Sequence, residues 1–194
     1  MSEIFDTPTK DVAIIHKSRH EMYLPRIATF EKVPYEQFKK DIINSHCLDY
    51  ATDEMIKDIY DNIKRPERGT KDSAGYDFFA PYKFSLDKGK SVVIPTGIRA
   101  KIDIGWWLMM VPRSGSGFKY KVELYNTIGV IDGDYYNSDN YGHIMIKLTS
   151  EKKCEFEKGN GFCQGIFTIY GITTDDKAIA IRNGGFGSTD VVNN

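Results

Sequence analysis

The strongest constraint on the fold is a series of short β-branched and aromatic runs that begins at Phe84. Glycine, proline, asparagine and aspartate separate these runs, and such alternation is typical of an all-β sandwich or barrel. Five runs are predicted to be strands: Ser91 to Ile94, Arg99 to Ile102, Trp106 to Val111, His143 to Thr149, and Ile166 to Ile172. Three segments are predicted to be turns: Pro95 to Gly97, Asp103 to Gly105, and Lys158 to Gly161.

One predicted strand shows which of its faces should be buried. Ile144, Ile146 and Leu148 alternate with more polar neighbours. Because successive side chains of a strand point to opposite faces, these three should lie in the core.

The segment from Val33 to Lys64 has helical periodicity instead. Its spaced apolar residues are Tyr35, Phe38, Ile42, Met55, Ile56, Ile59, Tyr60 and Ile63. Pro34 suits the first position of one helix, and Thr52 can cap a second. We expect a helical hairpin whose apolar stripes pack on the β domain or on a neighbouring subunit. Recognition of a protein partner is the alternative.

Length and charge limit the remaining possibilities. A chain of 194 residues favours one cored domain with an appendage. Its formal net charge is −1, without the basic excess of proteins that follow a nucleic-acid backbone, so a free nucleotide is the better ligand. The longest apolar run, Trp106 to Val111, is too short to span a membrane. A soluble, cytoplasmic protein is expected.

The cysteines and histidines do not form a recognisable site. Three cysteines without paired spacing predict neither disulfides nor a zinc site. Cys163 as a nucleophile is the alternative to a small buried thiol, which the sequence favours. The four histidines lack ligand spacing and are expected to be surface or partly buried polar residues.

The segment from Arg182 to Thr189 holds a cation, three glycines, an aromatic ring and two hydroxyls. Glycines let the backbone approach phosphates, and the guanidinium and hydroxyls add donors. This composition predicts a mobile nucleotide clasp in which Phe186 covers a base. A frayed glycine-rich tail is the alternative.

Five ordered segments together resemble the motifs of the trimeric dUTP diphosphatase (dUTPase) family. They are Ser73 to Asp77, Pro112 to Gly115, Gly129 to Tyr135, Gly159 to Phe167, and the tail from Arg182 to Thr189. About the first seventy residues lie outside the resemblance.

The resemblance implies a jelly-roll-like β fold assembled as a homotrimer, with each active site built from motifs on different subunits. It divides the chain into an N-terminal strand with a helical insertion at 1–65, a β domain at 66–181, and a mobile C-terminal arm at 182–194. The helical hairpin is therefore an insertion relative to the usual family pattern.

The resemblance also implies hydrolysis of dUTP to dUMP and pyrophosphate by water attack at the α-phosphorus. Asp132 would orient and activate the water and touch the sugar, although an aspartate in such a turn can also be only a turn former. Tyr135 would stack beneath the deoxyribose and exclude a 2′-hydroxyl. Asn126, from the same β-hairpin as Asp132, and the backbone at Gly129 would recognise uracil.

The phosphate ligands are implied in the same way. Arg113, Ser114 and Gly115 bring a guanidinium, a hydroxyl and a free amide together as a clamp, and Gln164 adds a neutral donor. Asp77 would hold waters of a Mg²⁺ ion bound mainly by the phosphates. From the arm, the predicted ligands are Arg182, Phe186, Gly187, Ser188 and Thr189.

Several segments depart from the family pattern. In the fifth motif one residue fewer than usual separates Arg182 from the double glycine, and Asp190 stands where a small residue is usual. The fourth motif lacks the usual acidic and basic pair before Gln164 and has Asn160 and Gly161 there. About five extra residues, 136–140, follow Tyr135 and are interpreted as a longer hairpin tip.

Two rival functions remain open. A dCTP deaminase, or a bifunctional deaminase and diphosphatase, shares the fold but carries a glutamate-centred motif where this chain has Ile131 to Tyr135. A nucleotide-sensing regulatory module would use the pocket as a switch and the helical hairpin as its effector.

Overall fold

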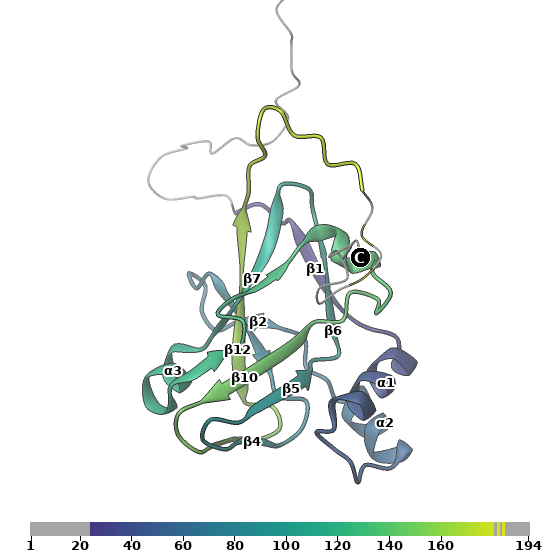
Figure 1. Cartoon of the computed structure of the whole chain (residues 1–194), viewed down its shortest axis with the longest axis vertical. Helices are drawn as coiled ribbons and strands as arrows, with labels where there is room; N and C mark the ends of the chain where they lie inside the picture. The colour runs from purple at the N-terminus through teal and green to yellow at the C-terminus, as the bar shows by residue number, and fades with distance from the viewer. Residues whose placement is uncertain (1–23, 181, 183, 185–194) are drawn as a thin grey trace, which may run out of the picture.

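The computed structural model describes residues 24–180, 182 and 184. Within them the chain is mostly β-sheet with few helices (Figure 1). The strands are β1 Ala28–Lys32, β2 Glu67–Arg68, β3 Gly75–Phe79, β4 Phe84–Leu86, β5 Ser91–Pro95, β6 Ile98–Ile102, β7 Trp106–Pro112, β8 Val122–Leu124, β9 Gly129–Ile131, β10 Met145–Ser150, β11 Cys154–Phe156 and β12 Gly161–Ile169. The helices are α1 Tyr35–Ser45, α2 Asp53–Asp61, α3 Ser114–Tyr120 and the 3-10 helix η1 Gly133–Asn137.

The largest sheet has five antiparallel strands in the order β2-β3-β12-β7-β9. A three-stranded sheet has the order β5-β10-β8, and β1-β6 and β4-β11 form two further pairs. Apart from β2 and β3, the paired strands are not consecutive in the chain. This order brings sequence-distant motifs to the same sheet.

The predicted strands are confirmed, with some shifted bounds. β10 begins at Met145, two residues later than expected, and β12 runs from Gly161 to Ile169 instead of starting at Ile166. Thus Gly161, predicted to lie in a turn, begins a strand, whereas the turn itself is at Lys158 and Gly159.

The core forms where the inner faces of the sheets meet. Ile144, Ile146 and Leu148 are 0%, 2% and 0% exposed, as their alternation predicts. Phe78 and Leu108 of the five-stranded sheet join the same core. Burying each such side chain contributes about 1.5–3 kcal/mol, so this shared core holds the sheets together.

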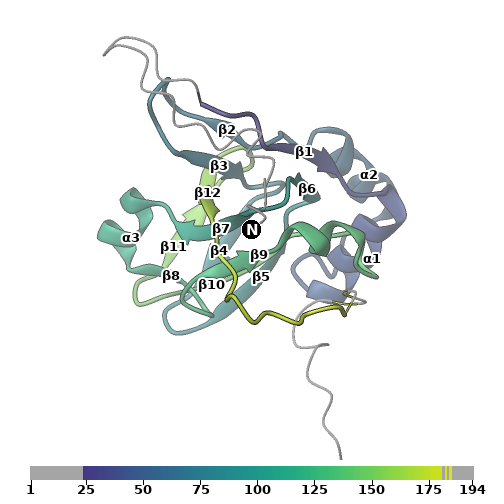
Figure 2. The ribbon, with the colours of Figure 1, turned by 90° about the horizontal axis from the view of Figure 1, so that it is seen from above.

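Two helices occupy the predicted segment and cover one side of the strands. Phe38 and Ile42 of α1, with Ile56 and Ile59 of α2, are buried in the main core, which confirms packing on the β domain. Figures 1 and 2 both show α1 and α2 together, on the opposite side of the strands from α3. The apolar stripes are therefore used inside the molecule.

The helix ends follow local chemistry. The Thr52 side chain accepts a hydrogen bond from the Met55 amide at 3.3 Å and caps α2, as predicted. Pro34 is the N-cap of α1 rather than its first residue, and its carbonyl accepts from the Phe38 amide at 3.1 Å.

The interpretation of residues 136–140 as a longer hairpin tip is wrong. β9 pairs with β7, while β10 pairs with β5 and β8, so the strands on either side of this segment do not form a hairpin. The segment instead completes η1 and a following turn. Ser138 stabilises this turn, because its hydroxyl donates to the Tyr135 carbonyl at 2.7 Å and accepts from the Gly142 amide at 3.2 Å.

Across the part of the chain that the structure describes, every helix is too short or too polar to cross a lipid bilayer.

Candidate active site

Asp132 and Asp134 flank the start of η1, directly after β9. Asp132 is the N-cap residue of η1, and its side chain is 43% exposed. Arg182 joins the two carboxylates: its Nη2 lies 2.5 Å from Asp132 Oδ2 and its Nε lies 2.9 Å from Asp134 Oδ1. The structure thus brings the predicted catalytic aspartate together with a predicted phosphate ligand from the arm.

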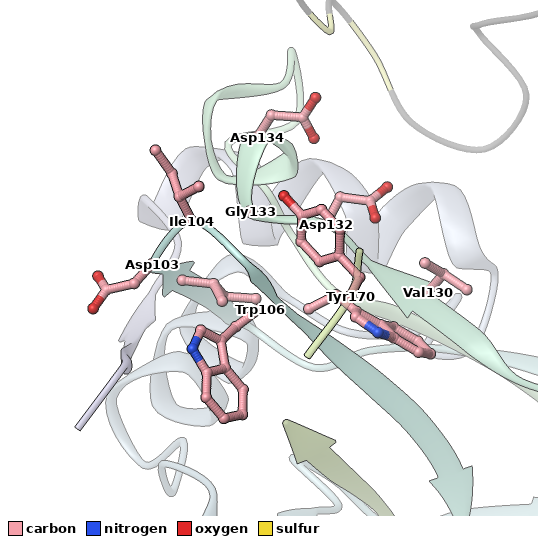
Figure 3. Close-up of a pocket in the computed structure, with 10 residues that line it drawn as sticks. Asp103, Ile104, Trp106, Val130, Asp132, Gly133, Asp134 and Tyr170 are labelled. Carbon is pink, nitrogen blue, oxygen red and sulfur yellow. The ribbon is translucent and has the colours of Figure 1, made fainter. Parts of the chain in front are cut away.

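A cavity of about 740 Å³ adjoins these carboxylates. Figure 3 shows the side chains that line it. They are Ile102, Asp103, Ile104, Trp106, Trp107, Val130, Asp132, Gly133, Asp134 and Tyr170. Aromatic and aliphatic walls suit an apolar partner or a base, whereas three carboxylates disfavour an unneutralised phosphate.

Tyr135 lies in η1, three residues after Asp132, and is only 5% exposed. Its hydroxyl donates to the His143 carbonyl at 2.9 Å and accepts from Asn140 Nδ2 at 2.8 Å. The Arg182 guanidinium lies over its ring, 5.9 Å from the ring centre. Burial raises the pKa of Tyr135, so the phenol is neutral at physiological pH and can donate.

A second group of predicted residues gathers where β3, β12 and β7 meet. Gln164 of β12 pairs with Asp77 of β3 and with Val111 of β7. Arg113 follows β7, and its Nε forms an ion pair with Asp77 Oδ1 at 2.9 Å. Gln164 Nε2 donates to the Pro112 carbonyl at 3.4 Å. The predicted phosphate clamp and the predicted metal ligand are thus direct neighbours.

Two glycines make room for this group. A Cβ on Gly161 would lie 2.6 Å from Arg113 Nη1, which donates to the Gly161 carbonyl at 3.1 Å. A Cβ on Gly75 would lie 2.4 Å from Gln164 Oε1. Gly161 was visible in the sequence as a departure from the fourth motif, but its contact with Arg113 was not.

Within one chain, the residues around Asp132 lie far from the residues around Arg113. Ile131 pairs with Leu108, which puts Asp132 beside Trp107, while Arg113 follows the opposite end of β7. Trp107 and Arg113 are six positions apart along the strand, a span of ~20 Å. The two groups therefore lie near opposite ends of β7 within one chain.

The remaining predicted ligands are more exposed. Asn126 lies in the exposed loop between β8 and β9, which are not paired with each other, so the predicted hairpin is wrong. Each strand finds a different partner: β8 pairs with β10 and β9 with β7. Gly129 is half-buried against Met110, and Ser114 and Gly115 are exposed at the start of α3. Phe186, Gly187, Ser188 and Thr189 lie outside the described residues.

The residues around Asp77 fit a magnesium ion that is bound mainly by the phosphates of a nucleotide. Among the described residues no three His, Cys, Asp or Glu side chains are placed to hold a metal. One partly exposed carboxylate, beside an amide, matches an ion that keeps several waters and binds chiefly to phosphates.

The thiol of Cys163 is a structural group. Its side chain is fully buried beside the Val111 carbonyl, at 3.1 Å, and burial raises its pKa to about 12. A protonated, inaccessible thiol is a poor nucleophile, which agrees with the prediction that Cys163 is a small buried residue.

Sequence reasoning missed one buried polar group near the site. His143 is 0% exposed, so the expectation of a surface or partly buried residue is wrong. Its Nδ1 lies 2.6 Å from Asp41 Oδ2, although the two residues are 102 positions apart. No local pattern marks such a pair.

Comparison with known proteins decides the family. The dUTPase family model matches residues 61–190, which include both groups of site residues. The chain belongs to the dUTPase family. The matched segment begins at the last residue of α2, so the helices lie almost wholly before it.

Individual dUTPases agree with this assignment. The chain is 39% identical over 132 residues to the deoxyuridine 5′-triphosphate nucleotidohydrolase of Lactococcus lactis, covering 66% of this chain and 88% of that protein. It is 31% identical over 138 residues to the mouse enzyme of the same name, covering 68% and 81%. The crystal structure of dUTPase from Streptococcus mutans aligns with a TM-score of 0.53 at 29% identity, covering 74% of this chain and 97% of that one.

Proposed function

We propose that this protein is a dUTP diphosphatase that hydrolyses dUTP to dUMP and pyrophosphate. The observation that carries the proposal is the position of Asp132, which directly follows β9 at the rim of a largely apolar cavity in a chain of the dUTPase family. A partly exposed carboxylate beside such a hollow can hold a water molecule against a bound nucleotide.

In the proposed reaction, Asp132 removes a proton from water as the water oxygen bonds to the α-phosphorus. The bond from the α-phosphorus to the bridging oxygen breaks, and pyrophosphate leaves with that oxygen. Arg182 pairs with Asp132 and Asp134, and can exchange these carboxylates for phosphate oxygens. This exchange would free Asp132 to accept the proton.

Arg113, Ser114, Gly115 and Gln164 hold the phosphates in this proposal. Their guanidinium, hydroxyl, amide and carboxamide groups are all donors. Asp77 would hold Mg²⁺ through water, and the bound ion would neutralise phosphate charge. The Arg113–Asp77 ion pair keeps the phosphate and metal ligands adjacent.

The nucleoside is proposed to bind around β9 and η1. The backbone at Gly129 and the side chain of Asn126 recognise uracil, and Tyr135 forms the wall beneath the deoxyribose. Because Tyr135 is buried and hydrogen-bonded at its hydroxyl, its ring is a firm wall against a 2′-hydroxyl. From the arm, Phe186, Gly187, Ser188 and Thr189 would close over the nucleotide.

We further propose that the protein acts as a homotrimer. The ~20 Å along β7 between Asp132 and Arg113 supports a site in which a neighbouring copy supplies one of the two groups. The cavity wall supports such packing, since Ile104 is 98% exposed, Val130 54% and Tyr170 50%. A contiguous exposed apolar surface of this kind is typical of an interface.

The decisive test is pyrophosphate release from dUTP, UTP, dCTP and dTTP in the presence of Mg²⁺, with ammonia release measured for dCTP. The proposal predicts pyrophosphate from dUTP far above the other nucleotides. Ammonia release from dCTP would indicate the deaminase instead. Binding of dUTP without turnover would indicate a regulatory module.

A further inference from the structure

We infer that Asp41, on α1, is a positioning residue for Tyr135 and acts through His143. The helical pair would then contribute to sugar selection from outside the segment that the family model matches. The inference rests on the proposed function, because that function assigns Tyr135 to the deoxyribose.

Both ring nitrogens of His143 have hydrogen-bond partners. The Gly97 amide donates to Nε2 at 2.8 Å, and Nδ1 lies 2.6 Å from Asp41 Oδ2. Because an amide N–H can only donate, Nε2 carries the lone pair and Nδ1 carries the hydrogen. Nδ1–H therefore donates to Asp41, and the ring, which is 0% exposed, has one permitted orientation.

Asp41 is itself held in place by its helix. Its side chain is 15% exposed, and Gln37, one turn earlier in α1, donates to the same carboxylate oxygen at 2.8 Å. Burial alone would raise the pKa of Asp41, but the hydrogen bonds from His143 and Gln37 outweigh burial and lower it. Asp41 is thus a fixed, ionised acceptor at neutral pH.

The other end of the chain of contacts is the Tyr135 hydroxyl. It donates to the His143 carbonyl at 2.9 Å, and Asn140 Nδ2 donates to both the hydroxyl and that carbonyl, at 2.8 and 3.3 Å. Ser138 holds the same turn, since its hydroxyl donates to the Tyr135 backbone carbonyl at 2.7 Å. The Tyr135 hydroxyl is therefore anchored to His143 and to Asn140.

The helical insertion and the extra residues at 136–140 thus converge on one tyrosine. The helical pair acts on it through Asp41 and His143, whereas Asn140 contacts its hydroxyl directly. Removing the Asp41 carboxylate would leave His143 Nδ1–H buried without an acceptor, which forces the ring to shift. A shift of His143 moves the carbonyl that holds the Tyr135 hydroxyl, and with it the sugar wall.

The test compares Asp41→Ala, Asp41→Asn and Ile42→Val. Ile42→Val is the matched control, because it loosens the docking of α1 without touching the hydrogen bonds. The quantity measured is the ratio of kcat/KM for dUTP to that for UTP, with Tm recorded for each variant. We expect Asp41→Ala to lower the ratio about three- to tenfold, since small displacements at a site are costly. Asp41→Asn keeps an acceptor for His143 and should retain most of the wild-type ratio.

An unchanged ratio in Asp41→Ala, with a fall in Tm like that of Ile42→Val, would overturn the inference and leave the proposed function intact. If Asp41→Ala does not fold, Gln37→Met replaces it. This variant removes one donor to Asp41 and should lower the ratio in the same direction by less. A ratio equal to that of the wild type would again count against the inference.

A second readout needs no substrate. In protein with labelled tyrosine rings, the Tyr135 resonance, assigned with Tyr135→Phe, should shift in Asp41→Ala and stay in place in Ile42→Val. A wild-type protein that hydrolyses no dUTP would refute the proposed function, yet this resonance would still decide the coupling. An unmoved Tyr135 signal would refute the coupling itself.

Discussion

The Arg182 guanidinium forms an ion pair with the Asp132 carboxylate, 50 positions earlier in the chain, at 2.5 Å. Three carboxylates surround the cavity at this point: Asp103, Asp132 and Asp134. Arg182 offsets part of this negative charge, which would otherwise repel a triphosphate. The arm therefore supplies the ion-pair partner of the proposed base, and the proposed function makes the same residue a phosphate ligand.

Asp132→Asn should abolish turnover while preserving the fold and dUTP binding. A neutral amide cannot accept the proton of the attacking water, and general-base contributions are about 10² to 10⁴ in rate. Single-turnover hydrolysis of dUTP measures the effect. Asp103→Asn is the control, because Asp103 lines the same cavity from the turn before β7. A near-wild-type rate in Asp132→Asn would remove Asp132 from the mechanism.

Tyr135→Ala should narrow the preference for dUTP over UTP, because removal of the ring opens space for a 2′-hydroxyl. Since Tyr135 is 5% exposed, its loss should also lower stability by about 3 kcal/mol. Values of kcat/KM for both nucleotides, at a temperature where the variant is folded, give the preference. Tyr136→Phe serves as the comparison. An unchanged preference would locate sugar selection at another residue, such as Tyr141.

Gly161→Ala should weaken phosphate binding. The added Cβ would lie 2.6 Å from Arg113 Nη1 and displace the guanidinium from its ion pair with Asp77. We expect about a tenfold loss of kcat/KM, the cost of one charge-assisted contact. Gly69→Ala is the control, since its Cβ would have no neighbour within 4 Å. Equal kcat/KM in the two variants would show that Arg113 does not depend on Gly161.

The parts of the structure that depend on local sequence patterns could be predicted from the sequence. Alternation along β10 predicted its buried face, and the apolar spacing of Phe38, Ile42, Ile56 and Ile59 predicted two packed helices. The family resemblance implied that Asn126 and Asp132 share a hairpin, and this was wrong, because β8 and β9 do not pair with each other. Here β7 supplies the partner of β9 through Leu108 and Ile131.

The buried hydrogen bonds of His143 could not be predicted from the sequence, for a different reason. His143 gains its role from Asp41, 102 positions away, and from the Gly97 amide. Neither contact leaves a periodic signal, because each depends on how α1 docks on the sheets. The resemblance implied a site built from motifs on different subunits, but the separation of Asp132 from Arg113 along β7 became visible only from the strand register.

Stability should depend on the ionisation of Asp41 in acid. Hydrogen bonds lower its pKa in the folded state, so its contribution is present above the unfolded value, about 3.9, and is lost as pH falls through the folded value. Urea unfolding between pH 2 and 6 should show a shallower acid loss for Asp41→Asn than for the wild type. Parallel curves would mean that Asp41 ionisation is not linked to folding.

A chain that ends at residue 181 should lose most of its turnover but keep its assembly and Tm. It lacks the Arg182 ion pairs and the proposed arm ligands, whereas a partly exposed ion pair contributes little to stability. A chain that ends at Thr189 is the control and should remain active. Dissociation of the shorter chain would instead make the arm a structural element.

The most direct test of the account mixes two inactive variants. The Asp132→Asn and Arg113→Ala proteins are mixed, unfolded together and refolded, so that mixed assemblies form. These assemblies are assayed for pyrophosphate release from dUTP. If Asp132 of one copy works with Arg113 of another, some sites in the mixture contain both native residues, and activity should return well above that of either variant alone. A mixture that assembles but remains as inactive as its parents would contradict a site shared between copies.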